Sequence, residues 1–327
     1  DAGPGHPDGW IQMACRFESM LPDLLEMLRF SADHATLTKD TIEEHCRSIL
    51  SVLRAAFDVP HDSPHYATIF ISACGALRAF VDFHPDLANK FLTPNYEHLI
   101  ERFVKALKGS KGLGLQYGIP GVPQDFQGAV SKLIISRGAE ALVALTRPDT
   151  KVATELLTDD VVVTNLVWAL AEFAQESIEP VLTIPLLRLT AVLASLCPHL
   201  LEALVGGALV HVIRILRKQE HDPAMVFHTL LAMCHLVADV NVDVLQRLNV
   251  ATLVCGAMTR HKDDHDVVDT GCRILTVIIL DDESGQTRDT VRSVEGFLPF
   301  LVETLRIQDS VEEKFPKENF RVIREMR

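Results

Sequence analysis

The chain between His221 and Leu305 alternates amphipathic helical stretches with short polar breaks. Apolar residues recur at spacings of three and four across Ala224–Asp239, and again across Val267–Leu280. This spacing places the apolar side chains on one face of a helix. A shorter helical run, Ala251–Met258, lies between the two long ones. The pattern therefore predicts an all-α architecture in which long and short helices alternate.

The ends of the second helix in each expected pair indicate a repeat length. These ends read VKAL, VWAL, IRIL, GAM and ETL, and they close on Leu107, Leu170, Leu216, Met258 and Leu305. Their separations are 63, 46, 42 and 47 residues. A self-similar helical unit of about 40 residues is typical of stacked HEAT or armadillo repeats, and an insertion explains the longest step. We therefore expect a right-handed α-solenoid of helical repeats.

The long helices share a small residue four positions before a leucine. The pairs are Ala73 and Leu77, Gly138 and Leu142, Ala232 and Leu236, and Gly271 and Leu275, whereas Leu189 and Leu193 fit less well because Leu189 is not small. With this pattern, over roughly residues 64–305, the chain resembles the armadillo-repeat family, and HEAT repeats are the close alternative. The resemblance implies a solenoid that binds other proteins along its concave helix face.

The chain departs from the peptide-binding armadillo proteins at the positions that those proteins use. They resemble one another in an asparagine two residues after the leucine and often a tryptophan two before it, which hold the backbone of an extended peptide. The corresponding residues here are Ala79, Ala144, Ser195, Ala238 and Val277 after the leucine, and Gly75, Glu140, Ala191, Cys234 and Arg273 before it. A nuclear-import type of groove is therefore not expected, and small residues suit a bound helix or another protein's surface better.

Composition shifts divide the chain into regions. We expect residues 1–9 to be extended or disordered, residues 10–60 to form a helical cap, residues 61–307 to hold the repeats, and residues 308–327 to form a charged tail or capping helix. The Gly/Pro-rich stretch 108–124 is the insertion, and a loop of this length is usually functional or disordered. Within the repeats, Gly206 and Gly207 are expected to separate the helices Leu200–Val205 and Ala208–Arg217.

Charge and hydropathy exclude some classes of partner. The formal net charge of −13 argues against non-specific binding to nucleic acid, because phosphate-rich partners need a basic surface. It suits a basic partner segment, although acidic solenoids are also common without such a role. The sequence has no apolar run of 18 residues, so no membrane span is expected.

The cysteines indicate a reducing compartment. There are 7 of them, none in a CxxC pair, and most lie on the apolar faces of expected helices. We therefore predict a cytoplasmic location, with association with the cytoskeleton as one version. Because residue 1 is Asp rather than Met, we expect a fragment, a processed form or the ordered part of a longer chain.

The cluster of His and Asp side chains around residues 261–269 resembles a metal site at first. His261 and His265 have a spacing that Zn²⁺ could use on one helix face. The stretch is a break between helices, however, and Asp264 and Asp266 are better interpreted as N-caps of the next helix. The glycines of 108–124 do not follow a phosphate-binding pattern. No catalytic, cofactor or metal site is predicted.

The segment Lys262–Glu283 is strongly acidic. It contains seven carboxylates against Lys262 and Arg273, gathered toward the two ends of one expected helix. One hypothesis is an acidic rim that receives a basic partner segment, with Asp281, Asp282 and Glu283 as its candidate residues. The alternative is a pair of ordinary solvated loops.

The function expected from these patterns is a non-catalytic scaffold or adaptor that binds other proteins through its concave helix face and the 108–124 loop. The helices expected to contribute are Tyr66–Phe83, Phe126–Leu145, Ala224–Asp239 and Val267–Leu280, and the exposed polar candidates are His228, His235 and Arg273. A structural subunit of a cytoskeletal or organellar assembly is one specific version. The alternatives are a chaperone-type or transport adaptor for a basic or helical segment, and an enzyme with an undetected site.

Overall fold

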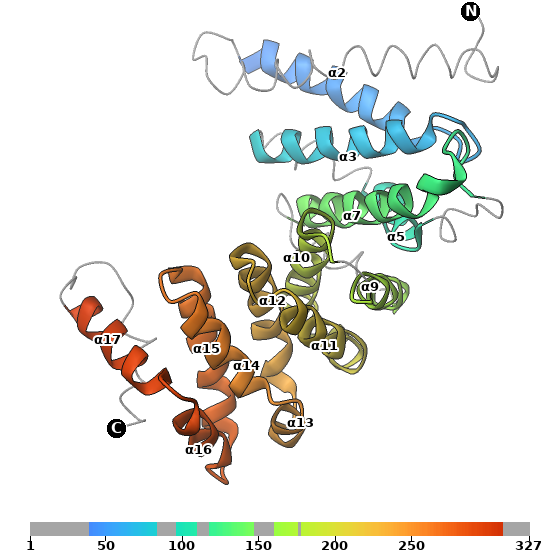
Figure 1. The fold of residues 1–327 in the computed structure, drawn as a ribbon. Coiled ribbons are helices and arrows are strands. Elements are labelled where there is room, and N and C mark those ends of the chain that lie inside the picture. The colour runs from blue at the N-terminus through green and yellow to red at the C-terminus, as the bar shows by residue number, and fades with distance from the viewer. Residues whose placement is uncertain (1–38, 84–95, 110–117, 147–159, 176–177, 310–327) are drawn as a thin grey trace, which may run out of the picture. The chain divides into compact units, whose positions relative to one another are not determined.

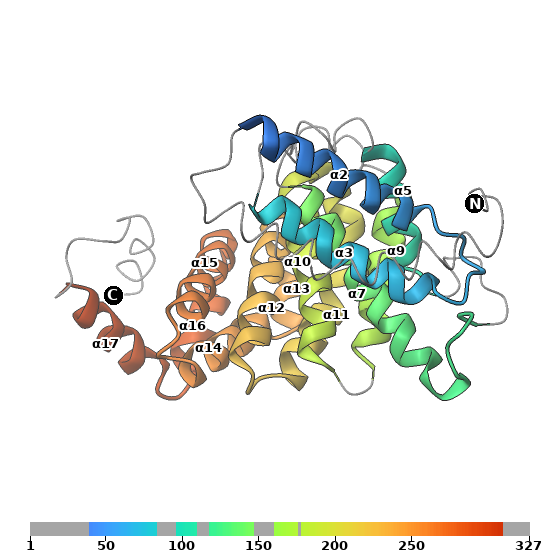
Figure 2. The ribbon, with the colours of Figure 1, turned by 90° about the horizontal axis from the view of Figure 1, so that it is seen from above.

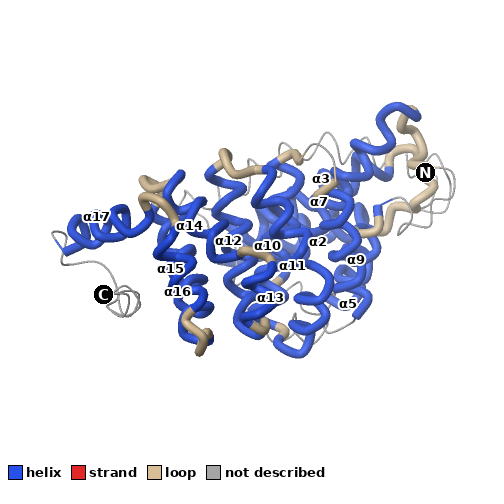
Figure 3. The backbone as a smooth tube through the Cα atoms, turned by 60° about the horizontal axis from the view of Figure 1, so that its bottom comes forward, coloured by secondary structure: helices blue, strands red, loops and turns tan. Residues whose placement is uncertain are grey.

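The computed structural model describes residues 39–83, 96–109, 118–146, 160–175 and 178–309 (Figure 1). Every regular element in these ranges is a helix and none is a strand, which confirms the all-α prediction (Figure 3). The expected N-terminal segment, the first half of the cap, the centre of the insertion and the charged tail lie outside the described residues. No helix in the described ranges is long and apolar enough to cross a membrane.

The chain divides into two compact units. Unit 1 is Asp1–Ala169 and unit 2 is Leu170–Arg327, with the boundary inside one helix. Helices of unit 1 are α2 (Lys39–Phe57), α3 (Tyr66–Phe83), α5 (Tyr96–Ala106), α7 (Gln127–Leu145) and the first part of α9 (Asp160–Phe173), with a 3-10 turn at Gln124–Phe126. Both α2 and α7 pack against α3, and α5 packs against α7 (Figure 2 shows α2 beside α3).

Aromatic side chains form the core of unit 1. Phe57 meets Phe103 edge to face with ring centroids 5.0 Å apart, and Phe70 lies 6.0 and 5.9 Å from these two rings. All three are almost completely buried. Edge-to-face packing of aromatic rings is favourable beyond the area that it buries, so this cluster joins the end of α2 to α3 and α5.

The last part of the Gly/Pro-rich insertion is held by hydrogen bonds. The Gln127 side chain accepts from the Ile119 amide at 2.6 Å and donates to the Ile119 carbonyl at 3.0 Å. Gly121 has φ +76° and lies so close to the Pro64 carbonyl that a Cβ would come within 2.3 Å of its oxygen. Only glycine fits there, because it lacks a Cβ and accepts a positive φ. This end of the insertion therefore packs against the turn that precedes α3.

Unit 2 contains the longer run of helices. They are α10 (Pro180–Leu196), α11 (Leu201–Lys218), α12 (Pro223–Leu236), α13 (Val242–Arg247), α14 (Val250–Arg260), α15 (His265–Asp281), α16 (Gln286–Ser293) and α17 (Phe297–Asp309), with 3-10 turns at Pro198–Leu200 and Val237–Asp239. The long helix α12 packs against α10 and α15, while α11 packs against α12 and α14 against α15. The helices α10, α12 and α15 thus follow one another as neighbours. The helix beside α12 is α11, with 18 residues against 14, and the helix beside α15 is α14, with 11 residues against 17.

The expected break at Gly206 and Gly207 is wrong, because α11 runs without interruption from Leu201 to Lys218. Buried Leu204, Ala208 and Val212 continue one apolar row across the two glycines. Gly206 lies in open space, so the glycines cost helix propensity but leave the packing intact. Tertiary packing of an amphipathic face outweighs such a propensity cost.

Three hydrogen bonds between elements connect residues 41 positions apart. Arg102 contacts His61 across 41 residues, Gln219 contacts the Ile178 carbonyl across 41, and His261 contacts the Glu220 carbonyl across 41. These contacts lie within unit 1 or within unit 2. Other hydrogen bonds between elements span 31, 36, 61 and 62 residues, so the separation of 41 recurs but is not constant.

Candidate functional site

The long helices α10, α12 and α15 each leave one row of side chains partly exposed. The rows repeat at spacings of three and four, so each row follows one face of its helix. We call these rows together the three-helix face; its members are Ile184, Arg188 and Val192 on α10, Phe227, His228, Leu231, Cys234 and His235 on α12, and Asp269, Arg273, Val277 and Leu280 on α15.

The apolar members of the three-helix face come from neighbouring helices. Phe227 and Leu231 on α12 are half-buried, as is Val277 on α15. Leu280 is 55% exposed, which is high for a leucine on a packed helix. Single exposed apolar residues are ordinary on a protein surface, whereas apolar rows on neighbouring helices form a surface that another molecule can cover.

Two histidines of α12 stand among these apolar side chains. Burial, and secondarily the charge of Arg188 on α10, lowers the pKa of His228. Burial and then the charge of Arg273 on α15 lower the pKa of His235. Both rings are therefore neutral at neutral pH. Nδ1 of His228 is buried and has no hydrogen-bond partner within the described ranges.

The third predicted polar residue, Arg273, lies on α15. Its Nη2 is 2.8 Å from Oδ2 of Asp269 one turn earlier, and its side chain is 59% exposed. His235 and Arg273 lie on the packed helices α12 and α15, 38 positions apart in the sequence, and the charge of Arg273 contributes to lowering the pKa of His235. That His228, His235 and Arg273 bind a partner remains a prediction.

The three acidic candidates Asp281, Asp282 and Glu283 do not form one exposed group. Asp281 and Glu283 are exposed, but Asp282 is only 8% exposed, which differs from the expected rim. Its carboxylate accepts hydrogen bonds from the Ser284 and Thr287 amides and from the Gln246 side chain. A buried carboxylate needs such donors, so Asp282 has a structural role at the start of α16.

The same hydrogen bonds set the acidity of Asp282. Burial alone would raise the pKa of this carboxyl, but the hydrogen bonds from Ser284 and Thr287 outweigh burial and lower the pKa to about 2. The side chain is therefore charged at all physiological pH values.

Other carboxylates of the segment 262–283 also have local partners. Asp264 is the N-cap of α15, as predicted, and accepts from the amides of Asp266 and Val267. Asp269 pairs with Arg273 on the three-helix face. Within the described ranges, no group of three His, Cys, Asp or Glu side chains could hold a metal ion.

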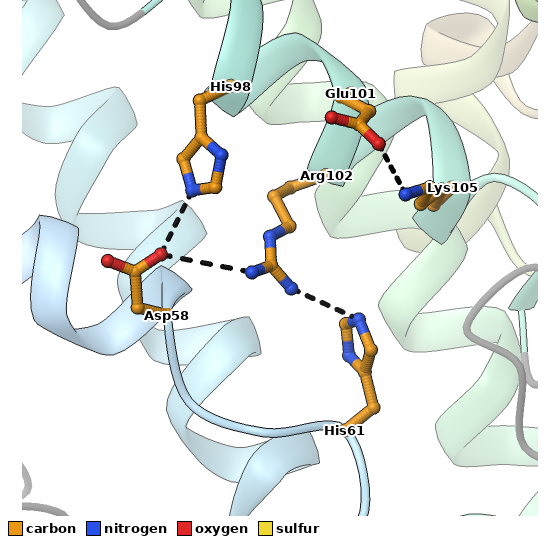
Figure 4. Close-up of polar contacts among 6 residues, drawn as sticks. All are labelled: Asp58, His61, His98, Glu101, Arg102 and Lys105. Atoms are coloured by element: carbon orange, nitrogen blue, oxygen red, sulfur yellow. Dashed lines mark hydrogen bonds and ion pairs between the residues drawn. The ribbon is translucent and has the colours of Figure 1, made fainter.

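A polar cluster in unit 1 was not expected from the sequence (Figure 4). Asp58, in the turn after α2, lies 2.9 Å from Nε2 of His98 and 3.8 Å from Nη2 of Arg102, both on α5. Arg102 Nη1 lies 3.1 Å from Nε2 of His61. Since guanidinium only donates, this nitrogen of His61 is the unprotonated one. The cluster connects the turn after α2 to α5. Its hydrogen-bonded residues are 40 and 41 positions apart, close to the predicted repeat length, and that length is the sequence signal that could have indicated the cluster.

A small cavity lies near α14 and α16. It has a volume of about 20 Å³ and is lined by Leu245, Gln246, Asn249, Ile278 and Thr290, among others. This volume accommodates about one water molecule, so the cavity is too small for an organic substrate.

No protein-family model matches the chain, and neither a curated protein nor a solved structure is a match.

Proposed function

We propose that this protein is a non-catalytic scaffold or adaptor that binds another protein through the three-helix face of unit 2. The observation that carries the proposal is the combination on neighbouring helices of partly exposed apolar rows with His228, His235 and Arg273. Protein interfaces combine apolar contact area with a few polar groups that fix orientation, and arginine is enriched at them.

The proposal includes a right-handed solenoid of armadillo-like repeats as the finer fold. Its support is the recurrence of a 41-residue separation in three hydrogen bonds between elements and the position of the small residues in the long helices. A Cβ on Gly138 of α7 would lie 3.0 Å from Cβ of Ala106 on α5, and one on Gly271 of α15 would lie 2.5 Å from Cγ of Met258 on α14. Both glycines therefore stand where a shorter helix crosses a long one, as equivalent positions of a repeat should.

The end of the insertion offers a second surface to the proposed scaffold. Phe126 follows it directly and is 59% exposed. The hydrogen bonds of Gln127 hold the adjoining turn in one conformation, so a partner that contacts Phe126 would meet a preformed surface.

The test is affinity capture from a native extract with matched variants. Leu280→Glu places a charge on the three-helix face, and Val210→Glu places one on α11, where Val210 is 46% exposed. We expect a stoichiometric partner that co-purifies with the wild type and with Val210→Glu but not with Leu280→Glu. Equal recovery by both variants would refute the assignment of the face. Thermal unfolding of each variant checks that the fold is retained.

A further inference from the structure

We propose that the partner on the three-helix face is a second copy of this chain, and that the two copies meet face to face about a two-fold axis parallel to α12. This inference rests on the proposed function, because it names the partner for the same surface. The order of charges across α10, α12 and α15 supports it, since that order makes the face complementary to itself.

The central helix of the face presents a row without formal charge. The partly exposed residues of α12 are Phe227, His228, Leu231, Cys234 and His235, and both histidine rings are neutral at neutral pH. The whole chain has a formal net charge of −13, so most surfaces of two copies repel each other. An uncharged row with apolar members is a surface on which two such chains can approach.

The two flanks of the face have opposite net charge. Helix α12 packs against both α10 and α15 and lies between them (Figures 1 and 2). The only charged residue of α10 is Arg188, and Glu179 lies nine residues earlier at the N-cap. The exposed stripe of α15 has Arg273 against carboxylates at Asp266, Asp269 and, at the end of the helix, Asp281. The α10 flank is therefore positive and the α15 flank is net negative.

A two-fold axis parallel to α12 brings each flank of one copy against the opposite flank of the other. It keeps α12 against α12 and exchanges the two sides of the face, so α10 of each copy lies opposite α15 of its partner. The contact between flanks then forms twice, because a two-fold interface uses the same surface on both copies. An axis across the helices would instead oppose α10 to α10 and α15 to α15, which places like charges together.

The register of the helices places opposed charges at the same level. Arg188 lies five residues before Leu193, the leucine that marks the register of α10. Asp269 lies six residues before Leu275, the corresponding leucine of α15. At a rise of about 1.5 Å per residue, the two positions differ by about 1.5 Å along the helices. Because an axis parallel to α12 preserves this level, Arg188 of one copy lies opposite Asp269 of the other.

The carboxylate of Asp269 can accept a second arginine. It pairs with Arg273 of its own helix at 2.8 Å, and its side chain is 40% exposed. An ionised carboxylate has two oxygens that can each accept more than one hydrogen bond. In unit 1 the Glu140 carboxylate is shared in this way by Arg78 and Arg137. Arg188 of a partner copy would form the same kind of shared pair across the interface.

Sedimentation of the purified chain tests the dimer. We expect the wild type at twice the 36.3 kDa of one chain, and Leu280→Glu as a monomer. Arg188→Asp and Asp269→Arg each oppose like charges at two places, so each should weaken the dimer by about ten-fold or more. Arg214→Asp on α11, also at an exposed arginine, is the matched control and should leave the dimer unchanged. Thermal unfolding of each variant checks that the fold is retained.

A mixture of the two charge variants tests the pairing itself. In a mixed pair, the reversed charge at position 188 of one copy meets the reversed charge at position 269 of the other, and the second contact keeps its native charges. We therefore expect an equimolar mixture of Arg188→Asp and Asp269→Arg to form a dimer under conditions in which neither variant does so alone. A variant that had only lost its fold would not be rescued by mixing.

The outcomes separate the two proposals. A wild-type chain that stays monomeric at about 100 µM, or a dimer that both charge variants leave intact, would overturn the inference. The proposed function would still hold if the wild type, but not Leu280→Glu, captured a different protein. It would fail together with the inference if the two chains captured the same proteins.

Discussion

Helix α7 in unit 1 and helix α15 in unit 2 each have a charged residue two positions before a leucine, but the two charged side chains have different surroundings. Glu140 stands two residues before the leucine of α7, where Arg273 stands in α15. Glu140 is buried and pairs with Arg78 of α3 and with Arg137 of its own helix. Arg273 is exposed and pairs along α15 with Asp269.

The comparison shows that a charged residue at corresponding positions of two helices can be buried in a contact between helices, as Glu140 is, or remain exposed on the face proposed to bind a partner, as Arg273 does. In unit 1 the carboxylate is shared between neighbouring helices, so its charge contributes to their packing. In unit 2 the helices α12 and α15 pack through apolar contacts, and the charged groups remain accessible from outside. Paired buried charges are structural, and accessible donors are what a partner needs.

The largest expected effect comes from breaking the ionic contact of unit 1. Glu140→Gln keeps the shape of the side chain but places a neutral amide between Arg78 and Arg137. We expect it to lower the free energy of unfolding by about 1–3 kcal/mol, a range that allows for the partial exposure of both arginines. Asp269→Asn in unit 2 is the matched control and should cost less than about 0.5 kcal/mol, because an exposed i,i+4 pair contributes little. Urea unfolding followed by circular dichroism measures both; equal losses would contradict the comparison.

The second prediction concerns the glycines at the helix crossings. Gly271→Ala forces Met258 aside, and we expect it to be less favourable than Gly256→Ala by about 1–2 kcal/mol, because Gly256 has open space around it. In unit 1, Gly138→Ala and Gly75→Ala form the same kind of pair, since only Gly138 faces a neighbouring helix. Both control variants should be neutral or stabilising because alanine favours the helix. Thermal unfolding of the four variants decides whether the two crossings are equivalent.

The sequence predicts the helices better than the contacts. Its periodicity correctly gives Tyr66–Phe83, and Asp264 is correctly identified as an N-cap, because these features depend on local physics. The break at Gly206 was wrong since packing against other helices decides it. The burial of Asp282 could not be foreseen either, because one of its donors is Gln246, 36 residues away. Such pairings depend on how the repeats pack, which periodicity alone does not specify.

A third prediction compares a buried and an exposed carboxylate of unit 2, Asp282 and Asp281. Asp282→Ala removes the acceptor for the Thr287 amide in the first turn of α16 and for the Ser284 amide before it, and it should cost about 1–2 kcal/mol. Asp281→Ala, at an exposed position, should cost less than about 0.5 kcal/mol. Because the pKa of Asp282 is lowered to about 2, its contribution is complete above the ordinary carboxyl pKa and disappears as the pH falls toward 2. Acid titration of the wild type and Asp282→Ala should therefore give curves that approach each other below the ordinary carboxyl pKa and converge only as the pH nears about 2; a constant difference would contradict this role.

The smallest expected effect is the response to mild acid, and it should differ between the units. Burial lowers the pKa of His61 in unit 1, where Arg102 and Lys105 add to the effect and Asp62 opposes it. In unit 2, burial lowers the pKa of three histidines, and the charge of an arginine lowers each of them further. The pairs of histidine and arginine are His211 with Arg214, His228 with Arg188, and His235 with Arg273.

The sign of this response follows from proton linkage. A histidine whose folded pKa lies below 6.5 contributes full stability above that pH, and the contribution is lost as the pH falls through 6.5 toward the lowered value, because the unfolded chain then binds more protons. We expect hydrogen exchange, corrected for its intrinsic pH dependence, to accelerate between pH 7.5 and 5.5 more in α12 than in the turn around His61. The double variant His228→Gln and His235→Gln should flatten the response of α12 alone. Equal acceleration in both segments, or an unchanged α12 profile in the double variant, would show that these two histidines do not distinguish unit 2 from unit 1.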